Sequence, residues 1–414
     1  MRSKHTALAL LLAVVVTIIP NTTLSTAETT AQQSISIHGS IEGLGWLHTS
    51  GNQIQTASGT QFIFKGAAIG TTNWGWSQLN TYTNGNCNEN LITYLKASGG
   101  NSIRLTLTWY QYNPTYFAII DQVVNWCTAQ NVYVILDFHY GDPNMGSVAD
   151  QDALKIMQNP NASLNTLLTP SSSSKQWFGD YPDISWIGLL QFYAARYVNN
   201  PTVSMINILN EPCANQLSDS ILFSIWRNAA TQAVDAIHAV NSNVLVAVYG
   251  MAWGNSLVDW YANPLPQNNV VYAAEGAYMA YQVGYNSYAD AYIAGNYALG
   301  KQKWLTYLSQ NDILPMSIRY PVMVMEWGSM QWIGYNATLE PAYIQFTSDA
   351  LQVFAQNGLG SEYWTWDINS IGGDYLGHNL ASYNQGLLDY QNWMNNVLVL
   401  NARGELWQQY CQST

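Results

Sequence analysis

Charged side chains are scarce in this chain of 414 residues. Asp, Glu, Lys and Arg make up 9% of it, whereas about a quarter is usual in soluble proteins. Only 13 residues are Lys or Arg, and the formal net charge is -12 at pH 7. This balance argues against nucleic acid and anionic membranes as partners. A surface with few ionisable groups changes its charge little with pH, so we hypothesise work in acid; a compositional habit of the lineage is the alternative.

Long apolar runs are also scarce. One run at residues 7–19 follows the basic Arg2 and Lys4 and is short for a membrane span. Small residues at 25–27 suit a cleavage site. We therefore expect a signal peptide at 1–27, a loose segment at 28–35, a single domain at 36–414 and a secreted, extracellular protein. An uncleaved membrane anchor is the alternative, which Pro20 disfavours.

Cysteines are few, and their spacing fits no zinc pattern. The four are Cys87, Cys127, Cys213 and Cys411. In an exported protein they are disulfide candidates, and four cysteines allow three pairings.

Apolar, strand-like runs recur along the chain with helix-sized intervals between them. The runs are 62–70, 102–109, 133–140, 204–212, 244–251, 270–278, 322–328 and 361–367. Eight such units predict an α/β protein, a single (β/α)8 TIM barrel. Short segments split by glycines at 36–62 predict a small β-hairpin layer before it. A doubly wound sheet is the alternative, but no Gly-rich phosphate fingerprint follows the first run.

One interval is much longer than the others. Residues 142–185 contain four prolines and a run of serines. We expect an extended surface loop there, on the face of the barrel that carries its chemistry.

Two of the predicted strands end in a glutamate. Glu211 follows an apolar run and precedes Pro212, and Glu326 ends the run that starts after Pro321. Barrels place their chemistry at the carboxyl ends of the strands. Two carboxylates displayed in this way indicate acid/base and nucleophilic chemistry on a glycosidic bond.

Other strand ends carry aromatic and hydrogen-bonding residues that suit a sugar. Sugars present flat C–H faces to aromatic rings and hydroxyls to polar side chains. The candidate substrate-binding residues are Trp74, Arg104, His139, Asn210, Tyr278 and Trp364. Arg104 is also expected to pair with Glu326 and keep it ionised. His139 would bind a sugar hydroxyl or orient Arg104.

Five stretches, in order along the chain, resemble motifs of glycoside hydrolase family 5, the cellulase family. They are Asn101-Ser102-Ile103-Arg104-Leu105, Leu136-Asp137-Phe138-His139-Tyr140, Ile208-Leu209-Asn210-Glu211-Pro212, Val324-Met325-Glu326-Trp327-Gly328 and Tyr363-Trp364-Thr365-Trp366. The likeness runs from about residue 36 to the C-terminus, and the chain resembles secreted archaeal and bacterial endo-β-1,4-glucanases. It implies that Glu211 is the acid/base, Glu326 the nucleophile and Trp364 the floor of a sugar subsite.

The sixth strand departs from the family pattern. The family usually has a His-x-Tyr element there, whereas this chain has Glu275-Gly276-Ala277-Tyr278. Glu275 would bring a third carboxylate close to Glu326, and like charges at short range favour retention of a proton. A local shift of register would let Tyr278 take the tyrosine's role.

The resemblance implies retaining hydrolysis of internal β-1,4-glucosidic bonds in cellulose or related glucans. The carboxyl groups of Glu211 and Glu326 should then lie about 5 Å apart. No metal or organic cofactor is needed, and we expect a monomer that acts on a polysaccharide. The open alternatives are a β-mannanase, an exo-acting β-glycosidase, and a non-enzymatic carbohydrate-binding surface protein.

Overall fold

The computed structural model describes residues 43–69, 89–107, 114–139, 146–167, 183–213, 217–276, 278, 287–329, 337–364, 366 and 400–413. The predicted signal peptide, the segment 28–35, Trp74 and Cys87 lie outside these ranges. They remain predictions.

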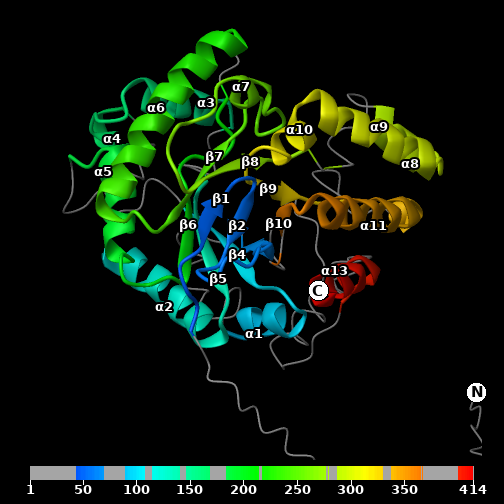
Figure 1. The fold of residues 1–414 in the computed structure, drawn as a ribbon. Coiled ribbons are helices and arrows are strands. Elements are labelled where there is room, and N and C mark those ends of the chain that lie inside the picture. Colours follow the sequence, from blue (N-terminus) through cyan, green and yellow to red (C-terminus); the bar gives the residue numbers. More distant parts are fainter. Residues whose placement is uncertain are drawn as a thin grey trace, which may run out of the picture. The chain divides into compact units, whose positions relative to one another are not determined.

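Parallel strands close into a barrel, which Figure 1 shows nearly end-on. In chain order they are β3 (Lys65–Ile69), β4 (Ser102–Leu107), β5 (Tyr133–Phe138), β6 (Val203–Asn207), β7 (Leu245–Tyr249), β8 (Val270–Ala274), β9 (Val322–Trp327) and β10 (Gly360–Tyr363). Each pairs with the next, and β10 closes the ring by pairing with both β9 and β3. All eight predicted strands are present, so the predicted TIM barrel is confirmed.

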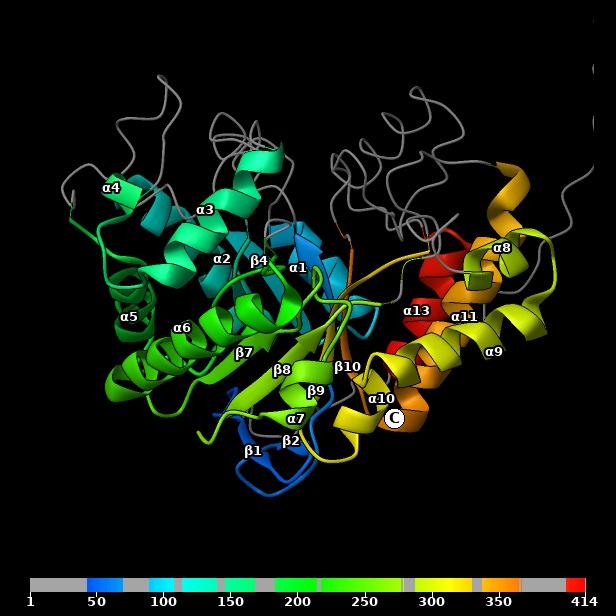
Figure 2. The same cartoon turned by 90° about the horizontal axis from the view of Figure 1, so that it is seen from above.

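Helices surround the barrel because each presents one apolar stripe to the outward faces of the strands. The longer ones are α1 (Glu89–Ala97), α2 (Pro114–Gln130), α5 (Trp186–Arg196), α6 (Asp219–Val240), α9 (Tyr297–Gln310), α11 (Glu340–Asn357) and α13 (Ala402–Gln412). In α6, Leu222, Trp226, Ala233 and Ile237 are buried. They follow one another at intervals of one or two helical turns, so they lie on one face of the helix. Figures 1 and 2 show these helices as the outer layer around the strands.

The interval predicted as an extended surface loop is partly helical, so that prediction was wrong. Helix α3 (Gly146–Gln158) and the short α4 (Leu164–Leu167) lie within it. Ala153, Ile156 and Met157 are buried at helical spacing, and α3 contacts α6. Among the prolines that suggested a loop, the structure describes Pro160, which lies in the turn between α3 and α4.

The predicted hairpin layer is present at the N-terminal end of the barrel. Strands β1 (His48–Ser50) and β2 (Gln53–Gln55) pair antiparallel around a turn in which Gly51 has φ +58. Leu47 and Ile54 join the apolar cluster inside the barrel, and the Tyr133 hydroxyl donates to the carbonyl of Gly45 at 2.7 Å. Figure 2 shows the hairpin below the barrel strands. It closes the end opposite the candidate site.

The predicted disulfides find no support in the described residues. Cys127 and Cys411 are buried free thiols, in α2 and α13. Burial raises the pKa of both thiols well above the ordinary value. Both sit among apolar side chains, so they act as small core residues.

Candidate active site

The site is built on Arg104, which is fully buried inside the barrel on β4. Its Nη1 donates to Oε2 of Glu326 at 2.6 Å and to the carbonyl oxygen of Met325 at 3.0 Å. Its Nη2 donates to Oδ1 of Asn210 at 2.6 Å and lies 2.8 Å from Oδ2 of Asp137. One guanidinium therefore connects strands β4, β5 and β9 with the segment after β6. The expected Arg104–Glu326 pair is confirmed.

Asp137 on β5 balances the positive charge of Arg104. Burial opposes ionisation of Asp137, but Arg104, then His139 and Asn207, outweigh it and lower the pKa of this carboxyl. Asn207 Nδ2 donates to Asp137 Oδ1 at 2.5 Å, and the two residues face each other in the β5–β6 register. The site thus contains an anion and a cation that are both fully buried and paired with each other.

Glu326 points into the site because β9 is irregular there. Period-two alternation with the inward Met323 and Met325 would turn Glu326 outward. The pairing with β10 changes register between Val324 and Trp327, which marks a β-bulge. A bulge re-aims the side chain beside it. Glu326 accordingly turns to Arg104, and Trp327 packs into the outer core.

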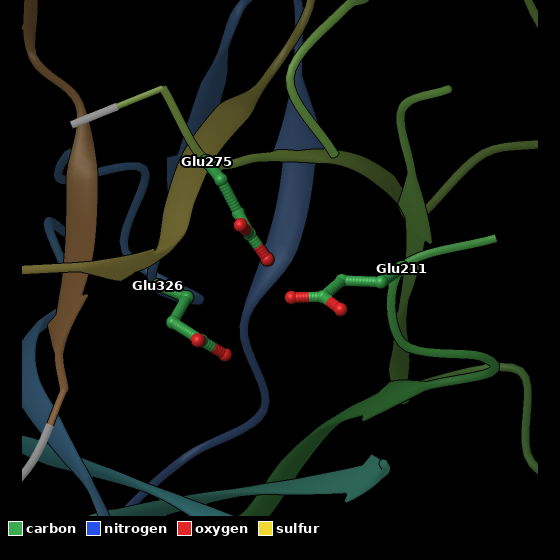
Figure 3. Close-up of side chains that lie close together, drawn as sticks. All are labelled: Glu211, Glu275 and Glu326. Carbon is green, nitrogen blue, oxygen red and sulfur yellow. The ribbon is translucent and has the colours of Figure 1, made fainter. Parts of the chain in front are cut away.

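Glu211 lies just beyond the end of β6 and has φ 45, in the left-handed region. This conformation is strained for a residue with a branched or long side chain and is found preferentially at functional sites. Asn210 before it continues the sheet, with its N–H donating to the carbonyl of Phe138 at 2.9 Å. The turn at Glu211 then directs its carboxyl across the barrel end toward Glu326 (Figure 3).

Tyr278 takes the place that the family assigns to a tyrosine, as the predicted register shift requires. Its hydroxyl donates to Oε1 of Glu326 at 2.9 Å. Gly276 has φ +86, which lets the chain turn after Glu275, and Tyr278 forms a parallel bridge with Gly328. Tyr288 on α8 (Ser287–Ile293) donates to the Tyr278 carbonyl at 3.1 Å. The two oxygens of Glu326 thus have different donors.

His139 and Trp364 form one wall of the site. Their rings are stacked, with centroids 5.3 Å apart and planes 9° apart. His139 Nδ1 lies 2.9 Å from Oδ2 of Asp137, which fixes the ring through an Nδ1–H donor and directs Nε2 away from Asp137. Trp364 also packs with Tyr278 and Ala68. His139 Nδ1 also lies 3.3 Å from Nη2 of Arg104, so the ring contacts both Asp137 and Arg104, which fits the second of its two predicted roles, to orient Arg104.

The predicted third carboxylate is present. Glu211, Glu275 and Glu326 converge in Figure 3, and each contributes a carboxylate oxygen within 4.8 Å of the others. Such a spacing can be satisfied by a cation or by a proton held between carboxyl groups. A hydrogen bond joins Glu275 to Glu211, and this bond requires a proton.

Two buried residues of this site, Asn207 and Tyr249, were missed in the sequence. Asn207 lies on the same inward face as Arg104 and Asp137, and Tyr249 places its ring 5.8 Å from the guanidinium carbon. The signal was available in the alternation of β5, β6 and β7, where polar residues interrupt apolar inward positions.

Comparisons with known proteins identify the family of this chain. The family model for cellulase, glycosyl hydrolase family 5, matches residues 56–370. An endoglucanase of Paenibacillus polymyxa is 26% identical over 372 residues, covering 79% of this chain and 81% of its own. Both chains therefore align over most of their length.

Solved structures show the same fold at lower identity. The catalytic domain of the major endoglucanase of Xanthomonas campestris pv. campestris is 17% identical, with a TM-score of 0.59, over 89% of this chain and all of that one (100%). A variant of the Thermobifida fusca endoglucanase catalytic domain, in complex with cellotetraose, is 16% identical with a TM-score of 0.57, covering 89% and 98%. With the family model matching more than half of its length, this chain belongs to glycosyl hydrolase family 5, the cellulase family.

Proposed function

We propose that this member of the cellulase family is a retaining endo-β-1,4-glucanase in which Glu326 is the nucleophile and Glu211 the acid/base. The observation that carries the proposal is the separation of these carboxyl groups, which have oxygens within 4.8 Å of each other. Retaining enzymes hold the pair about 5–5.5 Å apart, whereas inverting enzymes leave about 6.5–9.5 Å for a water molecule.

In the first step, an oxygen of Glu326 attacks the anomeric carbon. The bond from that carbon to the glycosidic oxygen breaks, and Glu211 gives its proton to the departing oxygen. Arg104 and Tyr278 donate to the two oxygens of Glu326. These contacts hold the carboxyl group of the nucleophile in place and limit its rotation.

In the second step, water replaces the leaving sugar. Glu211 takes a proton from this water as its oxygen bonds to the anomeric carbon, and Glu326 departs as a carboxylate. Asn210 uses Oδ1 to accept from Arg104, while its buried Nδ2 has no protein partner among the described residues. We infer that Nδ2 donates to the sugar 2-hydroxyl, where hydrogen bonds strengthen in the transition state. Trp364 offers the flat surface for the sugar ring.

The names of the relatives support a glucan as substrate and an internal point of cleavage. The Paenibacillus and Xanthomonas proteins are called endoglucanases, and the Thermobifida structure holds cellotetraose. Cleavage of mannan and release of sugars from a chain end stay as alternatives, because the loops that would decide them lie partly outside the described residues.

We further propose that the protein is exported and that residues 1–27 are removed on export. The basic start, the short apolar run and the small residues at 25–27 support this proposal. No helix of the described part is long and apolar enough to cross a membrane.

The test is reducing-sugar release from soluble β-1,4-glucan and from β-1,4-mannan, across acid to neutral pH. The wild type is compared with Glu326→Ala and with Glu405→Ala, which changes an exposed glutamate of α13. We expect glucan cleavage by the wild type and Glu405→Ala, and loss of at least about four orders of magnitude in Glu326→Ala. Initial products with the β-anomeric configuration in NMR spectra would identify retention.

Other outcomes change the proposal in defined ways. Cleavage of mannan alone would keep the mechanism and overturn the substrate. Release of only small sugars with little loss of viscosity would indicate exo action. Binding to the polymer without cleavage would identify a carbohydrate-binding protein.

A further inference from the structure

Glu275 takes part in neither step of the mechanism above, yet residues at this end of the barrel pack closely against its side chain. It follows β8 directly, is 4% exposed, and its N–H donates to the Gly254 carbonyl at 2.9 Å. Gly254 has φ +77, and a Cβ atom there would lie 2.8 Å from the Tyr249 ring and 3.1 Å from Cγ of Glu275. The loop after β7 therefore needs a glycine at this position to pack against the Glu275 side chain.

The contact between Glu275 and Glu211 requires a proton. Their carboxyl groups are hydrogen-bonded, and an ionised carboxylate can only accept, so one of the two groups must carry the hydrogen. The other oxygen of Glu275, Oε1, is buried and has no hydrogen-bond partner among the described residues. Nothing in that part of the chain compensates a negative charge on this oxygen by a hydrogen bond.

The groups that face Glu275 add negative rather than positive charge. They come from six parts of the barrel end: Arg104 on β4, Glu211 after β6, Tyr249 on β7, Tyr278 after β8, Tyr307 on α9 and Glu326 on β9. Arg104 is the only cation of this set and is already bound to Glu326 and Asp137. Burial, followed by the charges of Glu211 and Glu326, raises the pKa of Glu275 well above its ordinary value.

We propose that Glu275 is a positioning residue that shares one proton with Glu211, so that the acid/base retains a proton to higher pH than a lone glutamate would. The inference rests on the proposed hydrolase function and adds the control of its proton. The pair can lose its last proton only by placing two anions in contact, beside a third at Glu326. Such a doubly ionised pair is strongly disfavoured.

The shared proton fits the two steps without an additional reactant. When Glu211 gives the shared proton to the departing oxygen, the pair is left without a proton, and repulsion between the two carboxylates makes Glu211 a stronger base for the second step. When water attacks the glycosyl-enzyme bond, its proton returns to Glu211 and restores the pair. Glu275 forms no bond to the sugar, and the proton count is the same before and after the cycle.

The test is the pH profile of kcat/KM on soluble β-1,4-glucan. Glu275→Gln keeps the shape of the side chain and a hydrogen-bond donor but cannot share a titrating proton. We expect its acid plateau to persist while its alkaline limb moves to lower pH by about one unit or more. That shift equals roughly tenfold less activity on the falling limb. Glu275→Asp, which retains a carboxyl group, should lie closer to the wild type.

Glu362 provides the matched control. It is a second buried glutamate with a raised pKa, and it accepts a hydrogen bond from Ser102 inside the barrel rather than contacting Glu211. Glu362→Gln should leave the alkaline limb in place. An unmoved limb in Glu275→Gln, or an equal shift in both variants, would overturn the shared proton.

Infrared spectra separate this inference from the proposed activity. At neutral pH, the wild type should show carboxylic acid C=O bands from the Glu211–Glu275 pair and from Glu362. Glu275→Gln should remove the first and Glu362→Gln the second. If no glycan is cleaved but the first band is present and lost on substitution, the hydrolase proposal fails and the shared proton stands. If the band is absent from the wild type, the shared proton is wrong whatever the activity.

Discussion

Asp137 and Glu362 both lie inside the barrel, on β5 and β10, and neither side chain is exposed to solvent. Their ionisation differs. Arg104, His139 and Asn207 surround Asp137 and lower its pKa despite its burial. Glu362 accepts from Ser102 at 2.5 Å, but its Oε2 has no hydrogen-bond partner among the described residues, and burial raises the pKa of this carboxyl to about 8.

The strands next to each carboxyl explain the difference. Asp137 lies at the level where β4 and β6 contribute Arg104 and Asn207. Glu362 lies beside Gly66 of β3, where a Cβ atom would come within 2.3 Å of Glu362 Oε2 and of Ser102 Oγ. The missing side chain makes room for a carboxyl but supplies no cation. Burial is equal in the two places, so the hydrogen-bonding partners decide which carboxyl is ionised.

The largest expected effect comes from removing the charge of Asp137. Asp137→Asn leaves the buried Arg104 without the carboxylate that balances its charge on β5. Such a loss costs about 3–5 kcal/mol of unfolding free energy. Turnover should fall by roughly 100-fold, because Arg104 no longer holds Glu326 in place. Urea unfolding at neutral pH and kcat on soluble β-1,4-glucan measure the two losses.

The loss of stability in Asp137→Asn should depend on pH in a defined direction. The folded pKa of Asp137 lies below the ordinary 3.8, so its contribution is present above that value and is lost as the pH falls through the folded pKa. The wild type and Asp137→Asn should therefore converge in stability at strongly acid pH. Asp121→Asn is the control, because it breaks a partly exposed pair with Arg196 and should cost about 0–1 kcal/mol. Equal losses in both variants would contradict the assigned role of Asp137.

Glu362 should show the opposite pH dependence, with an effect that is smaller near neutral pH. Its folded pKa of about 8 exceeds the ordinary 4.5, so folding takes up a proton between these values. Wild-type stability should fall as the pH rises from 4.5 toward 8, by about 1.4 kcal/mol per pH unit attributable to this group. Glu362→Gln should lack that slope and be more stable than the wild type by about 2 kcal/mol or more at pH 7. Parallel pH–stability curves for the two proteins would show that Glu362 does not titrate as described.

The sequence was sufficient for the barrel and for the outline of the site. Apolar runs ending in polar residues located all eight strands, and Glu211, Glu326 and Arg104 follow from their positions in three of them. In a closed parallel barrel the carboxyl ends of all strands meet at one rim, so residues far apart in sequence become neighbours. This is a property of topology and needs no knowledge of side-chain packing.

What could not be predicted depends on local irregularities and on register. The inward aim of Glu326 needs the bulge in β9, and the strained turn at Glu211 has no signal in its neighbours. Asp137 and Asn207 pair because β5 and β6 align at that level, which a single strand does not reveal. Helix α3 was missed because nearby prolines outweighed a short apolar repeat.

The last prediction tests the register shift after β8, where the family pattern and this chain differ. Burial, followed by the charges of Glu326 and Glu275, raises the pKa of the Tyr278 hydroxyl, which stays protonated and donates to Glu326. Tyr278→Phe removes one hydrogen bond to a charged group, worth about 1.5–3 kcal/mol. We expect kcat to fall by about ten- to a hundredfold, with little change in KM.

Tyr133→Phe is the matched control, since its buried hydroxyl donates to Gly45 at the opposite end of the barrel. That variant should lose about 1 kcal/mol of stability and keep its turnover. If both variants lose turnover equally, the loss reflects weakened packing of the barrel, and Tyr278 is not the residue that orients the nucleophile.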